Sequence, residues 1–169
     1  MIERLETERL ILRRPTRADE AGAVAFYESD RSKFVGGPFK THIAWSCWAA
    51  DFGHWDLRGF GSFAVTMKGD DTCLGIVGPY YPATWPEFEI GWLIWPEAEG
   101  RGIAYEAARA CVDHAFRDLG WETAVSYIDP ENARSIALAE RLGAVRDDAA
   151  PRPDPEDYVF RHPRPERPA

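Results

Sequence analysis

Residues Gly100, Arg101 and Gly102 form a glycine turn of a kind that can bind a phosphate group. An apolar run at 88–95 precedes the turn, and a helix-type pattern at 103–119 follows it. The first N–H groups of a helix have no internal partner and lie at the positive end of its dipole. Glycine allows phosphate oxygens to approach the backbone closely, and Arg101 adds a positive charge. The pattern predicts an anion site at the start of this helix.

The elements that position this turn follow from hydrophobic periodicity and turn signals. Seven segments read as strands, at about 9–14, 62–68, 72–80, 88–95, 121–128, 144–146 and 158–161. Four segments have a helical period, at about 16–28, 40–58, 103–119 and 133–142. Three segments with loop composition connect them, at 30–39, 79–87 and 147–156. Strands alternating with helices indicate an α/β protein.

Length and composition indicate a globular chain. The sequence has 169 residues, of which 45% are hydrophobic and 13% aromatic. A chain of this size can bury a sizeable core as one domain. We expect the domain to cover residues 1–162, and the proline-rich segment 163–169 to be a disordered tail.

Charge and cysteine content limit the partners. The net charge of −8 argues against a nucleic-acid-binding surface. The three cysteines are widely spaced and form no metal-ligand pair, which suits a reducing compartment and predicts no metal site. No run is long enough for a membrane span, and the charged N-terminus is unlike a signal peptide. We therefore expect a cytoplasmic protein without a nucleic-acid or membrane partner.

Four segments, in the same order and spacing, resemble the GNAT N-acetyltransferases. They are EIGWLI at 89–94, GRGIAYEA at 100–107, the strand ending near Ile128, and NARSIALAERLGA at 132–144. Together with TERLILRRPTRAD at 7–19, they are most similar to the subgroup of ribosomal-protein N-terminal acetyltransferases, RimJ and RimL. The resemblance implies an α/β fold with a mixed sheet of six to seven strands and about four helices. It also implies a splay between two parallel central strands.

The resemblance further implies acetyl-CoA as co-substrate. Its pyrophosphate would lie on the backbone of the glycine turn and helix start, comprising Gly100, Arg101, Gly102, Ile103, Ala104 and Tyr105. Its pantetheine arm would lie along the strand at Leu93, Ile94 and Trp95. Asn132 matches the family's asparagine beside the pantetheine, although Asn also favours a helix N-cap, and both roles can hold together.

The same resemblance suggests catalytic groups. Glu89 matches a glutamate that accepts a proton from the amine, directly or through water. Glu87 lies on the same face of the strand, and a plain salt bridge is an alternative role for both acids. Ala139 stands where many members carry a tyrosine that protonates the leaving thiolate. Ser135, a water molecule or release of the thiolate into solvent could take its place. A backbone N–H near Ile94 would stabilise the developing oxyanion.

Two functions remain open from the sequence. One is transfer of an acetyl group from acetyl-CoA to a primary amine, by direct attack in a ternary complex; the acceptor is a protein N-terminus or a small-molecule amine. The other is a non-catalytic acyl-CoA-binding or regulatory module. Glu99, where the family has Gln or Arg, predicts weaker CoA affinity or a solvent-facing carboxylate. The resemblance also leaves a homodimer open. The acceptor would be chosen by the segments at about 30–60, 79–87 and 147–156.

Overall fold

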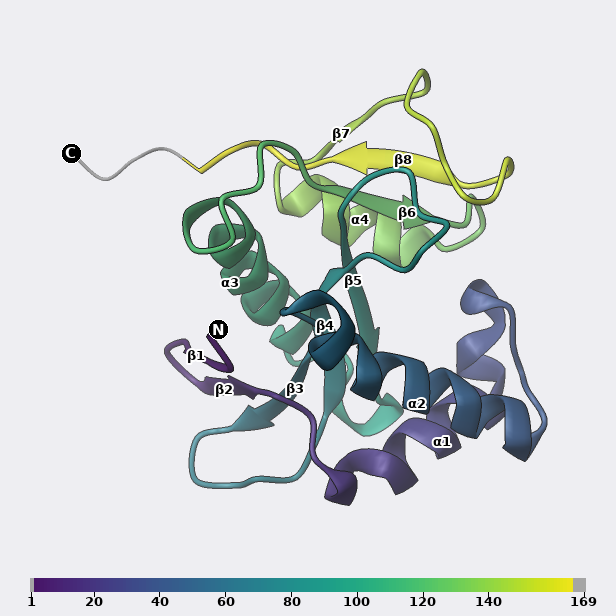
Figure 1. Cartoon of the computed structure of the whole chain (residues 1–169), viewed down its shortest axis with the longest axis vertical. Helices are drawn as coiled ribbons and strands as arrows, with labels where there is room; N and C mark the ends of the chain where they lie inside the picture. Colours follow the sequence, from purple (N-terminus) through teal and green to yellow (C-terminus); the bar gives the residue numbers. More distant parts are fainter. Residues whose placement is uncertain (1, 166–169) are drawn as a thin grey trace.

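A mixed sheet of eight strands forms the centre of the computed structural model, which describes residues 2–165 (Figure 1). The strand order is β1-β2-β3-β4-β5-β6-β8-β7. The strands are β1 Arg4–Glu6, β2 Leu10–Arg13, β3 Phe63–Met67, β4 Gly75–Tyr80, β5 Glu89–Ile94, β6 Val125–Ile128, β7 Val145–Arg146 and β8 Tyr158–Arg161. The helices are α1 Glu20–Glu28, α2 Thr41–Arg58, α3 Ile103–Arg117 and α4 Ala133–Arg141. Short 3-10 helices are η1 Arg17–Asp19, η2 Asp30–Val35 and η3 Pro96–Ala98.

The α/β fold and the four α-helices were predicted, but six to seven strands was too few. Strand β1 was missed because its three residues carry two charges and show no apolar alternation; it pairs antiparallel with β2. The segment at 121–128 was predicted as strand from its start, yet β6 begins at Val125. Trp121 instead packs in the core, with its N–H bonded to the Ala115 carbonyl (3.0 Å). The expected loop at 30–39 contains η2.

Different helices pack on the two faces of the sheet (Figure 1). Helices α1 and α2 pack on one face, where Ala64 of β3 and Ile76 of β4 meet Trp48. Helix α3 packs on the other face against Val65 and Val77. Helix α4 lies over β6 and β8 beside α3. Side chains of one strand therefore alternate between two separate cores.

Strands β5 and β6 are the only parallel neighbours among the described strands, and they diverge almost at once. Their ladder has one register pair, Glu89 with Val125. Beyond it, the Ser126 hydroxyl donates to the Ile90 carbonyl (2.6 Å) and contacts Nε2 of His162 (2.8 Å). A side chain thus takes the place of the next ladder N–H, and β5 keeps an unpaired edge. The splay predicted between two central parallel strands is present.

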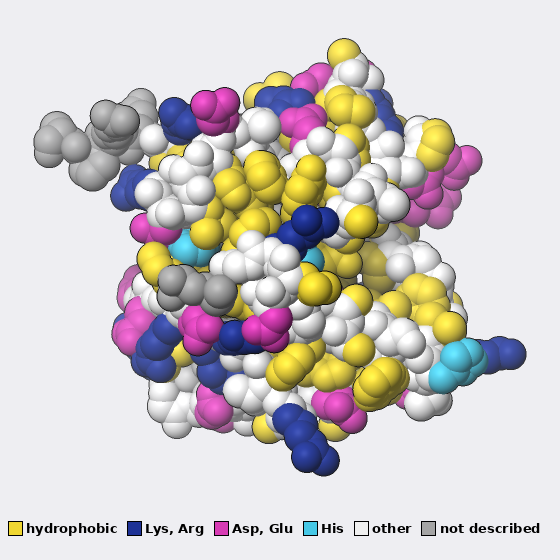
Figure 2. Space-filling view, in the orientation of Figure 1, with side chains coloured by type: hydrophobic (Ala, Val, Ile, Leu, Met, Phe, Trp, Pro, Cys, Tyr) yellow, Lys and Arg dark blue, Asp and Glu magenta, His cyan; other side chains and the backbone are white. Residues whose placement is uncertain are grey.

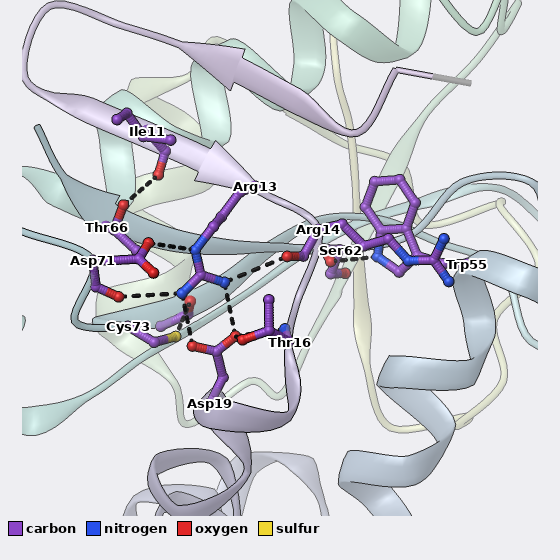
Figure 3. Close-up of polar contacts among 11 residues, drawn as sticks. Ile11, Arg13, Arg14, Thr16, Asp19, Trp55, Ser62, Thr66, Asp71 and Cys73 are labelled. Atoms are coloured by element: carbon purple, nitrogen blue, oxygen red, sulfur yellow. Dashed lines mark hydrogen bonds and ion pairs between the residues drawn. The ribbon is translucent and has the colours of Figure 1, made fainter.

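An ion-pair network fixes the start of α1 against the sheet (Figure 3). The Arg13 guanidinium on β2 binds both oxygens of the buried Asp19 (2.8 and 2.9 Å). It also binds the Asp71 carboxylate (2.6 Å), in the turn between β3 and β4. Asp19 accepts from the backbone N–H of Thr16 (2.7 Å), the residue predicted to begin this helix. The bidentate pair thereby joins β2, α1 and the hairpin turn.

The C-terminal segment is described as far as residue 165, so most of the predicted tail at 163–169 lies outside the described residues. Within it, the Arg164 guanidinium donates to the Trp121 carbonyl (3.1 Å). No helix between residues 2 and 165 has the length and apolarity needed to cross a bilayer.

Candidate active site

The glycine turn and the start of α3 form an open anion cradle. Gly100 and Gly102 have φ angles of 72° and 75°, which glycine adopts without strain. A Cβ added at Gly100 would meet no atom within 4 Å, so this backbone faces open space. The N–H of Glu106 is the first to bond back into the helix, to the Gly102 carbonyl (3.2 Å). The N–H groups of residues 103–105 therefore lie at the free end of the helix dipole.

A cavity of about 380 Å³ lies against this cradle, between η2, β5, α3 and α4. We call it the cofactor cavity. Nine of the predicted site residues line it: Leu93, Ile94, Gly100, Gly102, Ile103, Ala104, Tyr105, Asn132 and Ser135. Segments 40 residues apart in the sequence are thus brought to one hollow by the splay of the sheet.

Two predicted cofactor residues lie elsewhere. The Trp95 side chain is 3% exposed and packs on Phe26 of α1, with ring centroids 5.0 Å apart. Its backbone N–H bonds to the Leu74 carbonyl (2.9 Å), away from the gap between β5 and β6. Arg101 is exposed and does not line the cofactor cavity, and its carbonyl accepts from Arg9 (3.1 Å). The Trp95 assignment is corrected, because the strand alternation turns its side chain into the core. The Arg101 side chain is exposed, but the predicted role is that of its backbone, so this role stays a prediction.

The unpaired edge of β5 presents backbone groups to the cavities. The carbonyls of Phe88 and Ile90 bond towards β6, to the Val125 N–H (3.0 Å) and the Ser126 hydroxyl (2.6 Å). Backbone groups alternate in direction along a strand, so those of Trp92 and Ile94 point the same way. There β6 has already moved away. This edge can accept an extended, amide-bearing ligand.

Glu99 is held by arginines at the rim of the cofactor cavity. Its carboxylate binds Arg31 of η2, and its second oxygen binds Arg134 of α4 (2.8 Å). The Glu99 side chain is 21% exposed, so the alternative of a carboxylate turned freely into solvent is wrong. Lys33 and Arg141 line the same cavity. Positive charge thus exceeds negative charge around the cradle, in spite of Glu99.

A second cavity of about 920 Å³, the acceptor cavity, opens from the first. Both are lined by Trp92, Leu93, Asn132 and Ser135, at the gap between β5 and β6. The second cavity reaches the opposite face of the sheet, where α1, α2 and the segment before β8 line it. Figure 2 shows the surface hollowed between the α2 half and the β6–β8 half, with hydrophobic side chains on both sides. The splay is therefore a passage between two binding spaces.

Glu89 lies in the acceptor cavity at the point where β5 and β6 separate. Burial raises the pKa of its carboxyl group to about 7, against hydrogen bonds from the Trp85 indole and the Tyr127 backbone. A carboxylate with that pKa can accept a proton near neutral pH. Glu87 differs, because it forms a bidentate pair with Arg161 (2.7 and 3.0 Å). The salt-bridge role thus holds for Glu87, and Glu89 is left as the candidate base.

Asn132 and Ser135 begin α4 beside the gap. The Asn132 side chain caps the helix by accepting from the Ser135 N–H (3.2 Å), and it also lines both cavities. The Ser135 hydroxyl accepts from the Trp92 indole (3.1 Å). Because indole only donates, the hydroxyl hydrogen of Ser135 stays available to a ligand. Ala139 is fully buried between α4 and β6 and lines neither cavity.

Comparison with known proteins identifies the family. The sequence model for the acetyltransferase (GNAT) domain matches residues 9–145. This chain belongs to the GNAT acetyltransferase family. The GNAT chain is 41% identical to the acetyltransferase from Agrobacterium tumefaciens str. C58, with a TM-score of 0.91 over 96% of this chain and 95% of that one.

More distant relatives agree in fold. A putative ribosomal-protein-serine acetyltransferase from Vibrio cholerae is 24% identical, with a TM-score of 0.70 over 95% of this chain and 97% of that one. RimL is 14% identical, with a TM-score of 0.70 over 96% of this chain and 93% of that one. The predicted likeness to ribosomal-protein acetyltransferases thus holds at the level of the fold. Among curated proteins, the uncharacterized N-acetyltransferase YnaD of Bacillus subtilis is 27% identical over 85 residues, half of each chain.

The cofactor cavity fits the co-substrate of a GNAT enzyme. An open helix N-terminus preceded by two positive-φ glycines suits a pyrophosphate, and the free edge of β5 suits the amides of pantetheine. Four basic side chains, Arg31, Lys33, Arg134 and Arg141, add charge at the same hollow. Residues 2–165 contain no cluster of His, Cys, Asp or Glu that could hold a metal ion.

Sequence reasoning missed several residues of the two cavities. Asp51 lies within the aromatic stripe of α2, and an acid at the spacing of Trp48 and Trp55 could have marked it. Arg134 lies in the segment at 132–144 that resembles the family, but nothing in the sequence around it indicated a place in the cavity lining. Arg31 reaches Glu99 only through the fold, so no local pattern predicts that contact.

Proposed function

We propose that this GNAT protein transfers the acetyl group of acetyl-CoA to a primary amine, either a protein N-terminus or a small-molecule amine. The observation that carries the proposal is the passage at the β5–β6 splay. It joins a phosphate-binding cavity to a second cavity, with Glu89 beside the junction. Free reactants held in adjoining cavities can react by direct attack, without a covalent enzyme intermediate.

Each residue has a defined task in this proposal. Glu89 accepts the proton of the ammonium group, because burial brings its pKa to about 7. The amine nitrogen then bonds to the acetyl carbon as the carbon–sulfur bond breaks. The N–H of Ile94 faces the carbonyl oxygen, and the Ser135 hydroxyl donates a hydrogen bond to the departing thiolate. The acetylated nitrogen releases its remaining extra proton to solvent and becomes the amide, and the thiolate takes a proton from solvent.

The alternative is an acyl-CoA-binding module without catalysis, and one observation favours it. Ala139 cannot donate a proton, and its backbone position is packed in the core. The alternative predicts acetyl-CoA binding without CoA release from any amine.

The deciding experiment measures CoA release with a thiol reagent across amines, amino acids and peptides, alongside a thermal shift with acetyl-CoA. Release with at least one acceptor supports the enzyme. A shift without release supports the binding module, and neither signal rejects both. Gly102→Val should abolish the shift, because a β-branched residue at φ 75° is strained and would distort the turn that presents the helix N–H groups. Gly69→Val, at φ 86° in an open turn, is the matched control for backbone strain alone.

We also propose that the protein acts in the cytoplasm. Cys47, Cys73 and Cys111 are all free thiols, as suits the reducing cytoplasm where acetyl-CoA is available. A homodimer stays a prediction, for which the elution volume of the protein is the measurement.

A further inference from the structure

The acceptor cavity is lined by carboxylates that form no ion pair among the described residues. Five acidic residues line it against one basic residue, Lys33: they are Asp51, Glu89, Asp129, Asp154 and Asp157. None of the five forms an ion pair with another residue of the described chain. Acidic side chains also gather at the edge of the hollow, over the segment before β8 (Figure 2). The cavity therefore has an excess of negative charge for a cationic ligand.

Of these acids, Asp51 gives the strongest evidence for a bound cation. It is 9% exposed, on the face of α2 that packs towards the sheet. Its one hydrogen-bond partner is the Tyr27 hydroxyl, which donates to Oδ2 (2.6 Å). Burial raises the pKa of Asp51 to about 6, so the group is still ionised above neutral pH. A buried, ionised carboxylate without a counter-charge is costly in a stable fold, and a bound cation would offset that cost.

Asp51 and Glu89 lie at different places in the cavity. Tyr80 stands within electrostatic range of both, and their charges add to burial in raising its pKa. Asp51 comes from α2 and Glu89 from β5, and the charge of Asp157 also raises the pKa of Glu89. The same cavity has aromatic side chains in its lining, and a ring face attracts an ammonium group. The aromatic residues lining the cavity are Tyr27, Phe34, Tyr80, Trp85, Trp92 and Tyr127.

We propose that the acceptor is a small diamine, whose second ammonium group binds Asp51 between Tyr27 and Tyr80 while the first reacts beside Glu89. This inference rests on the proposed acetyl transfer. Only the amine at Glu89 loses its proton and gains the acetyl group. The second amine keeps its charge throughout and holds the substrate in place. A neutral or monocationic amine would leave Asp51 without its counter-charge.

The test compares amines of equal length that differ in the second charge: 1,5-diaminopentane with pentylamine, and 1,4-diaminobutane with butylamine. CoA release is measured at saturating acetyl-CoA in the wild type and in Asp51→Asn. The asparagine keeps an acceptor for the Tyr27 hydroxyl, so the fold is retained. We expect kcat/KM for the diamine to exceed that of the monoamine by at least about tenfold, mainly through KM. Asp51→Asn should bring the kcat/KM values of the two amines close together, mainly by lowering the value for the diamine.

A matched control lies on the same helix. Asp56 is exposed and pairs with Arg14 outside both cavities, so Asp56→Asn should keep the full preference for the diamine. Equal use of diamine and monoamine by the wild type would overturn the inference. So would a preference that survives in Asp51→Asn, or a peptide that outperforms every diamine.

Failure of the proposed chemistry gives a different result. If no amine releases CoA, calorimetric titration of 1,5-diaminopentane into the wild type and into Asp51→Asn still tests whether a diamine binds at Asp51. Binding to the wild type that the asparagine variant loses supports a diamine site at Asp51. Absence of binding to the wild type rejects it.

Discussion

At the residue scale, the Glu89 carboxyl group sits where burial opposes its charge and raises its pKa to about 7. Only the ionised form accepts a proton, so kcat/KM should rise about tenfold per pH unit below 7 and level off above it. In Glu89→Gln this dependence should disappear, and turnover at pH 7.5 should fall roughly 100-fold. Rates of CoA release between pH 5.5 and 9 measure both effects.

Two comparisons make this pH prediction specific. The pKa of Glu89 is raised in the folded state, so its ionisation lowers stability as pH rises from about 4.5 towards 7. Glu89→Gln should therefore unfold at no lower temperature than the wild type at pH 8, which separates lost chemistry from misfolding. Glu87→Gln breaks the pair with Arg161 and should keep the pH profile. Unchanged turnover of Glu89→Gln at saturating acceptor would remove Glu89 from the base role.

Glu99 sets the charge at the phosphate-binding end. It engages Arg31 and Arg134, which phosphate oxygens would otherwise attract, and it adds a negative charge nearby. Glu99→Gln should lower the Kd for CoA by about threefold to tenfold, an effect that shrinks as salt screens the charges. Calorimetry at two salt concentrations measures this. Glu97→Gln, exposed in the same segment, is the control, and equal tightening there would mean that only net charge matters.

At the scale of elements, Ser126 stands where the β5–β6 ladder ends, and its side chain replaces the next ladder hydrogen bond. Its hydroxyl joins the Ile90 carbonyl and the buried His162. Ser126→Ala leaves both groups without that partner and should lower the free energy of unfolding by about 1–3 kcal/mol. Urea unfolding measures the loss. Ser46→Ala, whose exposed hydroxyl bonds within α2, should change it by less than about 0.5 kcal/mol. A loss for Ser126→Ala no larger than that would show that backbone geometry alone parts the strands.

The elements differ in how far the sequence could specify them. Helix α3 was predictable because its apolar face and glycine turn are both local signals. Strand β1 was not, since Arg4–Glu6 is stabilised by pairing with β2 rather than by its own pattern. Trp121 shows the opposite error: an apolar residue next to a strand was read as part of it, but packing of its ring against Phe88 and Phe60 places it in the core.

At the scale of the whole molecule, the two cavities also differ in how far the sequence could specify them. The cofactor cavity is built mainly from β5, the turn at 100–102 and the start of α4, three segments whose sequences carry the family resemblance. The acceptor cavity combines α1, α2 and the segment before β8, which are far apart in the sequence. Asp51 and Asp157 come from those segments, so no spacing in the sequence could have paired either with Glu89.

The cofactor cavity also joins both halves of the fold, because η2 lines it from the α1–α2 side and α4 from the β6–β8 side. A ligand there should therefore stabilise the whole molecule. Acetyl-CoA at 100 times its Kd should add about 2.7 kcal/mol and raise Tm by roughly 5–10 °C. Amide hydrogen exchange should slow in residues 30–35 and 133–141 as well as in 100–105, and Gly102→Val should show none of this. Slower exchange confined to 100–105 would mean that the ligand contacts only the glycine turn, and that η2 and α4 do not close on it.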